Sequence, residues 1–158
     1  MAGEKYVDKA VVKLASFIDT NLPAKLRTLE SDQSLTADSV TDPVEVLTYR
    51  APFDNRSPLI EVFDVGWRFL DYINRIVSVN CTVAITYFSD ADLSAGEQRM
   101  RRYVTALLDC VLADTTLGAT VIAAIPTDGS SAVAHGDNAT THHVYTQGFD
   151  IHVFQGGS

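Results

Sequence analysis

Residues 77–87 alternate between apolar and mostly polar side chains, and this pattern constrains the fold more than any other feature of the chain. The apolar positions are Val77, Val79, Cys81, Val83, Ile85 and Tyr87. A period of two places all of them on one face of a β-strand. A strand with one apolar and one mostly polar face favours an antiparallel or mixed sheet that is covered on one side.

Two amphipathic helices are expected to provide that cover. Residues three and four apart share a helical face, and the first such series is Val7, Val11, Leu14, Ile18 and Leu22. Pro23 predicts that this helix stops near Asn21, and a shorter helical piece is expected through Leu26 and Leu29.

The second helix has a start signal, because Ser94 and Glu97 fit a capping box. The apolar stripe that follows is Met100, Tyr103, Val104, Leu107, Leu108, Val111 and Leu112. Asp90 and Asp92 lie just upstream, where the helix dipole favours negative charge. We read these two carboxylates as helix-start residues and not as a catalytic acid and base.

The remaining segments predict further strands and long loops. Strands are expected at 44–50, 59–65, 119–125 and 143–154, and loops at 31–43 and 67–76. A long mobile loop is expected at about 127–141, and 156–158 is expected to be a frayed tail. These expected elements indicate that residues 1–158 form a single domain of the α+β class. We expect a mixed, mostly antiparallel sheet of about four strands with both helices packed on one face.

The charge balance argues against some partners. The formal net charge is −8, whereas phosphate binding needs concentrated Lys and Arg. Adsorption to an anionic membrane is disfavoured for the same reason. No apolar run approaches the roughly 20 residues that cross a bilayer, and no signal peptide is evident, so a soluble protein is expected. Cys81 and Cys110 are expected to be reduced core thiols, with a disulfide or metal pair as the alternative.

Motifs for catalysis or cofactor binding are missing from the sequence. There is no nucleophile elbow and no glycine-rich phosphate loop. Adjacent strand residues point to opposite faces, so His142 and His143 are not expected to share a metal ion, and the histidines are expected at exposed loop or edge positions. We predict no enzymatic activity, no cofactor, no metal site and no catalytic residue.

Two groups of side chains are candidates for a protein interface. Arg99, Arg101 and Arg102 are either a solvated helix face or a contact with acidic residues of a neighbouring subunit. Trp67 and Phe69, next to Gly66, are either core residues under a loop or anchors of an interface, where aromatic residues are enriched.

The order of segments resembles the tail terminator (tail-completion) proteins of long-tailed bacteriophages. The resemblance covers most of residues 1–155 and depends on arrangement: an N-terminal amphipathic helix, then SPLIEVFDV (57–65), VSVNCTVAITYFSDAD (77–92), ALLDCVLADTTLGATV (106–121) and VYTQGFDIHVF (144–154).

This resemblance implies a virion structural protein of the tail or neck, made in the host cytoplasm. Such proteins form a ring, usually a hexamer, at the head-proximal end of the tail tube. The ring stops tube growth and offers a docking surface for the head. The expected partners are copies of the chain itself, the tail tube protein and the head–tail connector proteins. DNA would pass through without specific binding, and no membrane is involved.

Other functions stay open at this stage. A head-closure, connector or tail-tube subunit would have a similar size and composition. An alternative from another class is a small α+β ligand-binding domain or enzyme with a pocket near His152 or Asp150.

Overall fold

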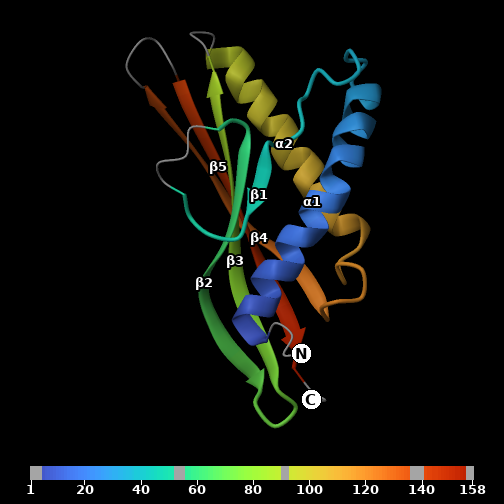
Figure 1. Cartoon of the computed structure of the whole chain (residues 1–158), viewed down its shortest axis with the longest axis vertical. Helices are drawn as coiled ribbons and strands as arrows, with labels where there is room; N and C mark the ends of the chain where they lie inside the picture. The colour runs from blue at the N-terminus through green and yellow to red at the C-terminus, as the bar shows by residue number, and fades with distance from the viewer. Residues whose placement is uncertain (1–4, 52–55, 90–92, 136–140, 156–158) are drawn as a thin grey trace.

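Two helices cover one face of a five-stranded sheet in the computed structural model, which describes residues 5–51, 56–89, 93–135 and 141–155 (Figure 1). The elements in chain order are α1 (Tyr6–Asp32), β1 (Glu45–Leu47), β2 (Leu59–Asp71), β3 (Ile76–Ser89), α2 (Leu93–Ala113), β4 (Ala123–His135) and β5 (Thr141–Phe154). The predicted α+β class is therefore confirmed.

The sheet has the strand order β1-β2-β3-β5-β4. β1 pairs with β2 in parallel, and every other pairing is antiparallel, so the sheet is mixed and mostly antiparallel as predicted. It has five strands and not about four. The 44–50 segment contributes only the three residues of β1.

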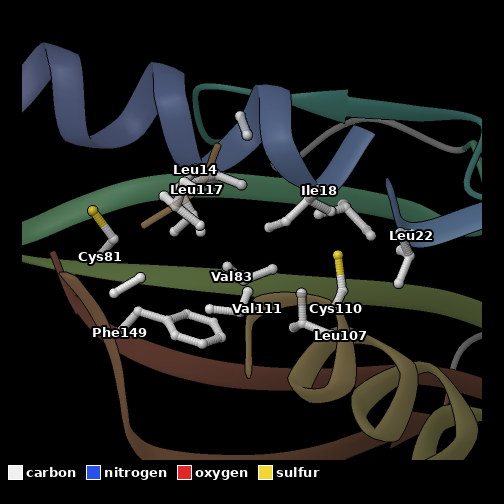
Figure 2. Packing of buried hydrophobic residues seen from close by; sticks show 14 of the residues in the cluster. Leu14, Ile18, Leu22, Cys81, Val83, Leu107, Cys110, Val111, Leu117 and Phe149 are labelled. Carbon is white, nitrogen blue, oxygen red and sulfur yellow. The ribbon is translucent and has the colours of Figure 1, made fainter. Parts of the chain in front are cut away.

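The core lies between the sheet and the helices. The predicted alternation is confirmed, because β3 spans Ile76–Ser89 and its side chains from Val77 to Ile85 at odd positions are buried. Figure 2 shows Leu14, Ile18 and Leu22 of α1 and Leu107 and Val111 of α2 converging on Val83 of β3 and Phe149 of β5. Burying each large side chain contributes about 1.5–3 kcal/mol, so this layer is the main source of stability.

The opposite face of the sheet is mostly polar. Asn80 and Thr82 of β3 face the same way as Asp150 of β5, which pairs with Asn80. Near β1 this face is partly covered, because the Arg50 guanidinium lies 4.3 Å from the ring centroid of Phe63. The alternating strand predicted that only one face of the sheet is covered, and this prediction is thus correct for most of the sheet.

The first helix is longer than the sequence indicates. Pro23 was expected to end it near Asn21, but α1 continues through Pro23 to Asp32. A proline inside a helix removes one hydrogen bond and costs about 3 kcal/mol or more. Leu22 and Leu26, on either side of Pro23, are fully buried against the core. Tertiary packing therefore outweighs the local penalty.

The second helix begins two residues earlier than the capping box requires. α2 starts at Leu93, so Ser94 is its second residue and does not cap it. Asp90 and Asp92 lie outside the described residues. The buried stripe is also narrower than predicted: Met100, Leu107 and Val111 are buried, whereas Leu112 is 56% exposed.

Strands replace much of the two loops expected at 67–76 and about 127–141, although residues 72–75 form the turn between β2 and β3. Residues 67–71 belong to β2, which continues past the predicted end at 65, and β3 resumes at Ile76. Residues 127–135 belong to β4, which starts at Ala123 and contains Pro126, and 136–140 lie outside the described residues. Propensity is a poor guide here, because a polar or glycine-rich stretch becomes a strand when a partner of matching register lies beside it.

The position of Pro126 follows from the topology. β4 is the edge strand of the sheet, and its pairing with β5 shifts register between Pro126 and Gly129. A proline lacks the N–H that a central strand needs, so edge strands and bulges are where a sheet tolerates it. The predicted end of this strand at residue 125, just before Pro126, was wrong for this reason.

Candidate interaction surface

Large apolar side chains gather on the hairpin formed by β2 and β3. We call residues 65–75 the hairpin arm; it comprises the second half of β2 and the turn before β3. Six of its side chains are between 44% and 77% exposed: Val65, Trp67, Phe69, Leu70, Tyr72 and Ile73. The arm lies at the end of the molecule where the N and C labels also stand (Figure 1). Exposed apolar residues are ordinary when scattered, but a contiguous group marks an interaction site.

The register of the sheet explains why the helices leave the arm uncovered. Trp67 pairs with Val79 and Phe69 with Val77, so both aromatic side chains face the side of the sheet that carries the helices. The helix α1 begins only at Tyr6, and its ring meets Phe69 edge-on with the centroids 6.0 Å apart. Helical cover therefore stops at the base of the arm, and Trp67 and Phe69 are not core residues under a loop.

The outer edge of the arm is free as well. β1 pairs with β2 only over residues 59–61, and no other strand of the described chain lies beyond β2. The backbone of the arm therefore presents an unpaired strand edge together with its apolar side chains. Natural proteins normally protect such edges, because they pair readily with another chain.

The turn at the tip is held by one carboxylate. Asp71 Oδ1 accepts hydrogen bonds from the backbone N–H groups of Ile73 and Asn74, each at 3.1 Å, and Oδ2 accepts from the Asn74 amide at 2.6 Å. These bonds, with those from Asn74 the strongest, lower the pKa of Asp71 below its usual value. The arm is therefore a defined hairpin that presents Tyr72 and Ile73 at its tip.

The arm carries two arginines and one aspartate, a net positive charge, which sets it apart from the rest of an acidic protein. Its ionisable side chains after Val65 are Arg68, Asp71 and Arg75, and Asp64 immediately precedes it. The chain as a whole carries −8. Two copies of an acidic protein repel one another on the whole, but a positive surface of one copy can approach an acidic surface of another. The arm is such a positive surface.

The arginine cluster lies elsewhere. Arg99, Arg101 and Arg102 are in the first turns of α2, at the end of the molecule opposite the arm (Figure 1). All three have partners within the chain: Arg99 lies 5.3 Å from the ring centroid of Tyr87, Arg101 is 3.7 Å from a Glu97 oxygen, and Arg102 Nε donates to Gln33 at 3.0 Å. The structure therefore does not combine the two candidate groups into one site.

One histidine is in an unexpected place. His143 was expected to be exposed, but it is fully buried in β5, and its Nε2 lies 2.8 Å from the Ser89 hydroxyl oxygen. Its Nδ1 has no hydrogen-bond partner among the described residues. Burial lowers the pKa of His143 below 6.5, and the Glu97 carboxylate partly opposes this. Because Nδ1 lacks the hydrogen-bond acceptor that orients a catalytic histidine, His143 fits a packing role better than a catalytic one among the described residues.

The two adjacent histidines point to opposite faces of the strand, as expected from its geometry. His142 pairs with Phe88 and His143 with Tyr87, so their side chains lie on opposite faces of the sheet. The ring of His142 stacks on Phe88 with the centroids 4.4 Å apart. Within the described chain, no three His, Cys, Asp or Glu side chains are grouped closely enough to hold a metal ion.

Four members of the arm were missed by the sequence analysis, namely Val65, Leu70, Tyr72 and Ile73. The signal was present, because 67–76 is rich in large apolar residues yet has no cleanly apolar helical face. An apolar stretch that fits neither a buried helix nor an alternating strand is a candidate for exposure on both faces of a hairpin.

Comparison with known proteins adds no assignment. No protein-family model matches the chain, and no curated protein matches it significantly. Among the described helices, neither combines the length and apolar character required to span a bilayer.

Proposed function

We propose that this protein is a ring-forming subunit of a bacteriophage virion, and specifically a tail terminator at the head-proximal end of the tail tube. The ring would stop growth of the tube and offer the head a docking surface. The main observation in support of the proposal is the exposed apolar arm. Such a surface favours association between copies of the chain far more than it favours a protein that remains monomeric in water. The order of segments in the sequence supplies the particular assignment.

The size of the arm supports a specific contact. An aromatic side chain buries about 150–250 Å² when covered. Six large side chains that are about half exposed or more therefore offer on the order of 500 Å², against roughly 800 Å² per partner in a standard interface. The arm is thus large enough to form the apolar centre of an interface, with a polar rim around it.

Oligomer size tests the first half of the proposal. Native mass spectrometry and light scattering on the purified chain should detect a ring, alone or after addition of tail tubes. Trp67→Ser with Phe69→Ser should reduce assembly strongly without unfolding the chain, because both side chains are more than half exposed. Ile125→Ser, at a 44% exposed position on β4, is the matched control and should assemble normally.

The tail tube tests the second half. Purified tubes incubated with the protein should bind it at one end and stop elongating, as seen by electron microscopy. Incorporation of the chain along the whole tube would identify a tube subunit instead. Binding to isolated heads and not to tubes would identify a head-closure or connector protein. The proposal would be refuted if the chain stays monomeric and does not bind tail tubes.

A further inference from the structure

A groove on the outer surface of the helix pair is the counterpart that the arm needs. It lies between the later turns of α1 and α2 and has a volume of about 410 Å³. Its apolar lining includes Leu29, Leu112 and Ala113. Leu112 is 56% exposed although it continues the apolar stripe of α2. An apolar position left open at the end of a buried stripe is a place where another chain can complete the packing.

The charges of the groove and of the arm are complementary. Asp32 and Asp109 line the groove and are both exposed, and Lys25 lies beside them, so the groove has a surplus of negative charge. On the arm, Arg68 and Arg75 are exposed, while the Asp71 carboxylate is hydrogen-bonded within the turn, so the arm has a surplus of positive charge. Opposite charges on two surfaces steer association and fix the orientation of the complex.

The positions of the two surfaces favour a ring over a dimer. The arm is at one end of the molecule, and the groove is on the helices away from it (Figure 1). A contact between two different surfaces is heterologous, and it adds copies one after another to give a ring where the rotation closes or a filament where it does not. Contact of arm with arm would be isologous and would stop at two copies.

We propose that the hairpin arm of one copy binds the α1–α2 groove of the next copy. Tyr72, Ile73 or Trp67 enters beside Leu112, while Arg68 and Arg75 face Asp32 and Asp109. The groove volume lies in the range of about 300–1,000 Å³ typical of binding pockets, which accommodates one or two large side chains. This inference depends on the proposed function, because it names the subunit contact of the proposed ring.

A charge-swap experiment tests the contact. Arg68→Glu with Arg75→Glu should weaken assembly by about tenfold or more, and so should Asp32→Lys with Asp109→Lys, since each creates like charges across the contact. A protein with all four changes should assemble again, because the charges are then exchanged and not removed. Asp128→Lys, on exposed β4, makes the same type of substitution at a single position away from both surfaces and should have no such effect.

The possible results of the charge-swap experiment distinguish a failure of the arm–groove contact from a failure of the proposed function. If the wild-type ring forms and the groove variant assembles normally, or if the fourfold variant stays dissociated while folded, the arm–groove contact is wrong and the ring proposal stands. If the wild-type chain remains monomeric at about millimolar concentration and in the presence of tail tubes, both are wrong. Circular dichroism on each variant identifies any loss of folding.

Disulfide trapping gives a second, independent readout. Ile73→Cys in one population and Leu112→Cys in the other should form a mixed crosslinked dimer on mild oxidation, while either population alone should not. The native Cys81 and Cys110 are buried and free, so they do not compete. Crosslinking of Ile73→Cys to itself, with none to Leu112→Cys, would indicate an arm–arm contact and overturn the inference.

Discussion

Gly96 of α2 lies directly against the imidazole of His143 in β5. A Cβ atom at position 96 would stand 2.8 Å from His143 Cε1, 2.9 Å from the Ser89 hydroxyl oxygen, and closer still to His143 Nε2. The start of α2 can therefore approach the sheet this closely only because residue 96 has no side chain. The contact joins the end of β3, the start of β5 and the first turn of α2.

Gly96→Ala should destabilise the protein, although alanine is the better helix former by about 1 kcal/mol. Overpacking a buried contact costs about 1–3 kcal/mol, so the steric penalty should exceed the gain in propensity. Urea unfolding followed by circular dichroism measures the difference. Ser94→Ala, at an exposed position of the same turn, is the control and should be neutral or slightly stabilising. Equal stability of Gly96→Ala and the parent would show that α2 does not press on His143.

The stability of the protein should fall as the pH drops below about 6.5 because of His143. Burial lowers the pKa of His143 in the folded chain, whereas the unfolded chain keeps the ordinary value of 6.5. Between those two values the unfolded state binds more protons, so acid favours unfolding. Each unit of difference between the two pKa values corresponds to about 1.4 kcal/mol.

Urea midpoints at about pH 7.5 and about pH 5.5 test this, with His143→Gln as the comparison. The variant should lose much of the pH dependence in this interval. Hydrogen bonds from Asn74 and Thr116 hold the pKa of Asp71 and Asp114 below 3.8, so those carboxylates titrate at lower pH. An unchanged slope in His143→Gln would assign the effect to other groups.

Both native thiols should be inert in the folded protein. Burial raises the pKa of Cys81 to about 12, with Asp64 and Asp150 adding to the shift, and burial raises the pKa of Cys110 to about 11. The thiolate is the reactive form, so neither residue should react with a thiol reagent at neutral pH. Titration with Ellman's reagent should detect no thiol in the native chain and both after denaturation. Rapid reaction of either thiol in the native chain would mean that the core opens readily.

Leu107→Ala should cost about 2–5 kcal/mol, because Leu107 is fully buried between α2 and the sheet. Leu112→Ala, one turn further along the same helix, should cost well under 1 kcal/mol because its side chain is more than half exposed. Chemical denaturation of the monomeric chain compares the two. A large loss of stability in Leu112→Ala without a ring present would contradict the open groove.

Arg101→Glu with Arg102→Glu should leave folding largely intact. Both arginines are partly or fully exposed, and surface ion pairs contribute only about 0–1 kcal/mol. Thermal unfolding measures this directly. If assembly is also unchanged, the cluster is a solvated helix face; if assembly is lost while the fold persists, it contacts an acidic surface of another subunit.

Periodic sequence patterns predicted the helices and strands whose apolar face is buried in the core. The strand at 77–87 and the final strand at 143–154 were placed correctly because most of their apolar residues repeat with a period of two. The two helices were identified for the same reason, although Pro23 and Ser94 misplaced one boundary of each. Local signals fix a boundary only where no distant contact competes with them, and Leu22 and Leu26 supply such contacts around Pro23.

The sequence identified only part of the candidate interaction surface. Trp67 and Phe69 were recognised as possible anchors, but their strand was not, because the arm obeys neither a helical nor a strict strand period. Its two register shifts, at Asp64/Gly66 and Phe69/Asp71, break the alternation that would have marked it. The groove could not be predicted at all, since Leu29 and Leu112 meet only when the two helices pack together.

The sequence by itself determined that one sheet face and two helix faces must be buried together, because alternating and three-to-four spacings leave no other way to remove those side chains from water. Only the tertiary structure decided how far the helices extend over the sheet. α1 starts at Tyr6 and reaches just the base of the arm, so the same strand that is buried at Ile60 is open at Trp67. Whether a side chain is exposed depends on which other elements pack against it in the folded chain. A local sequence pattern does not specify that packing.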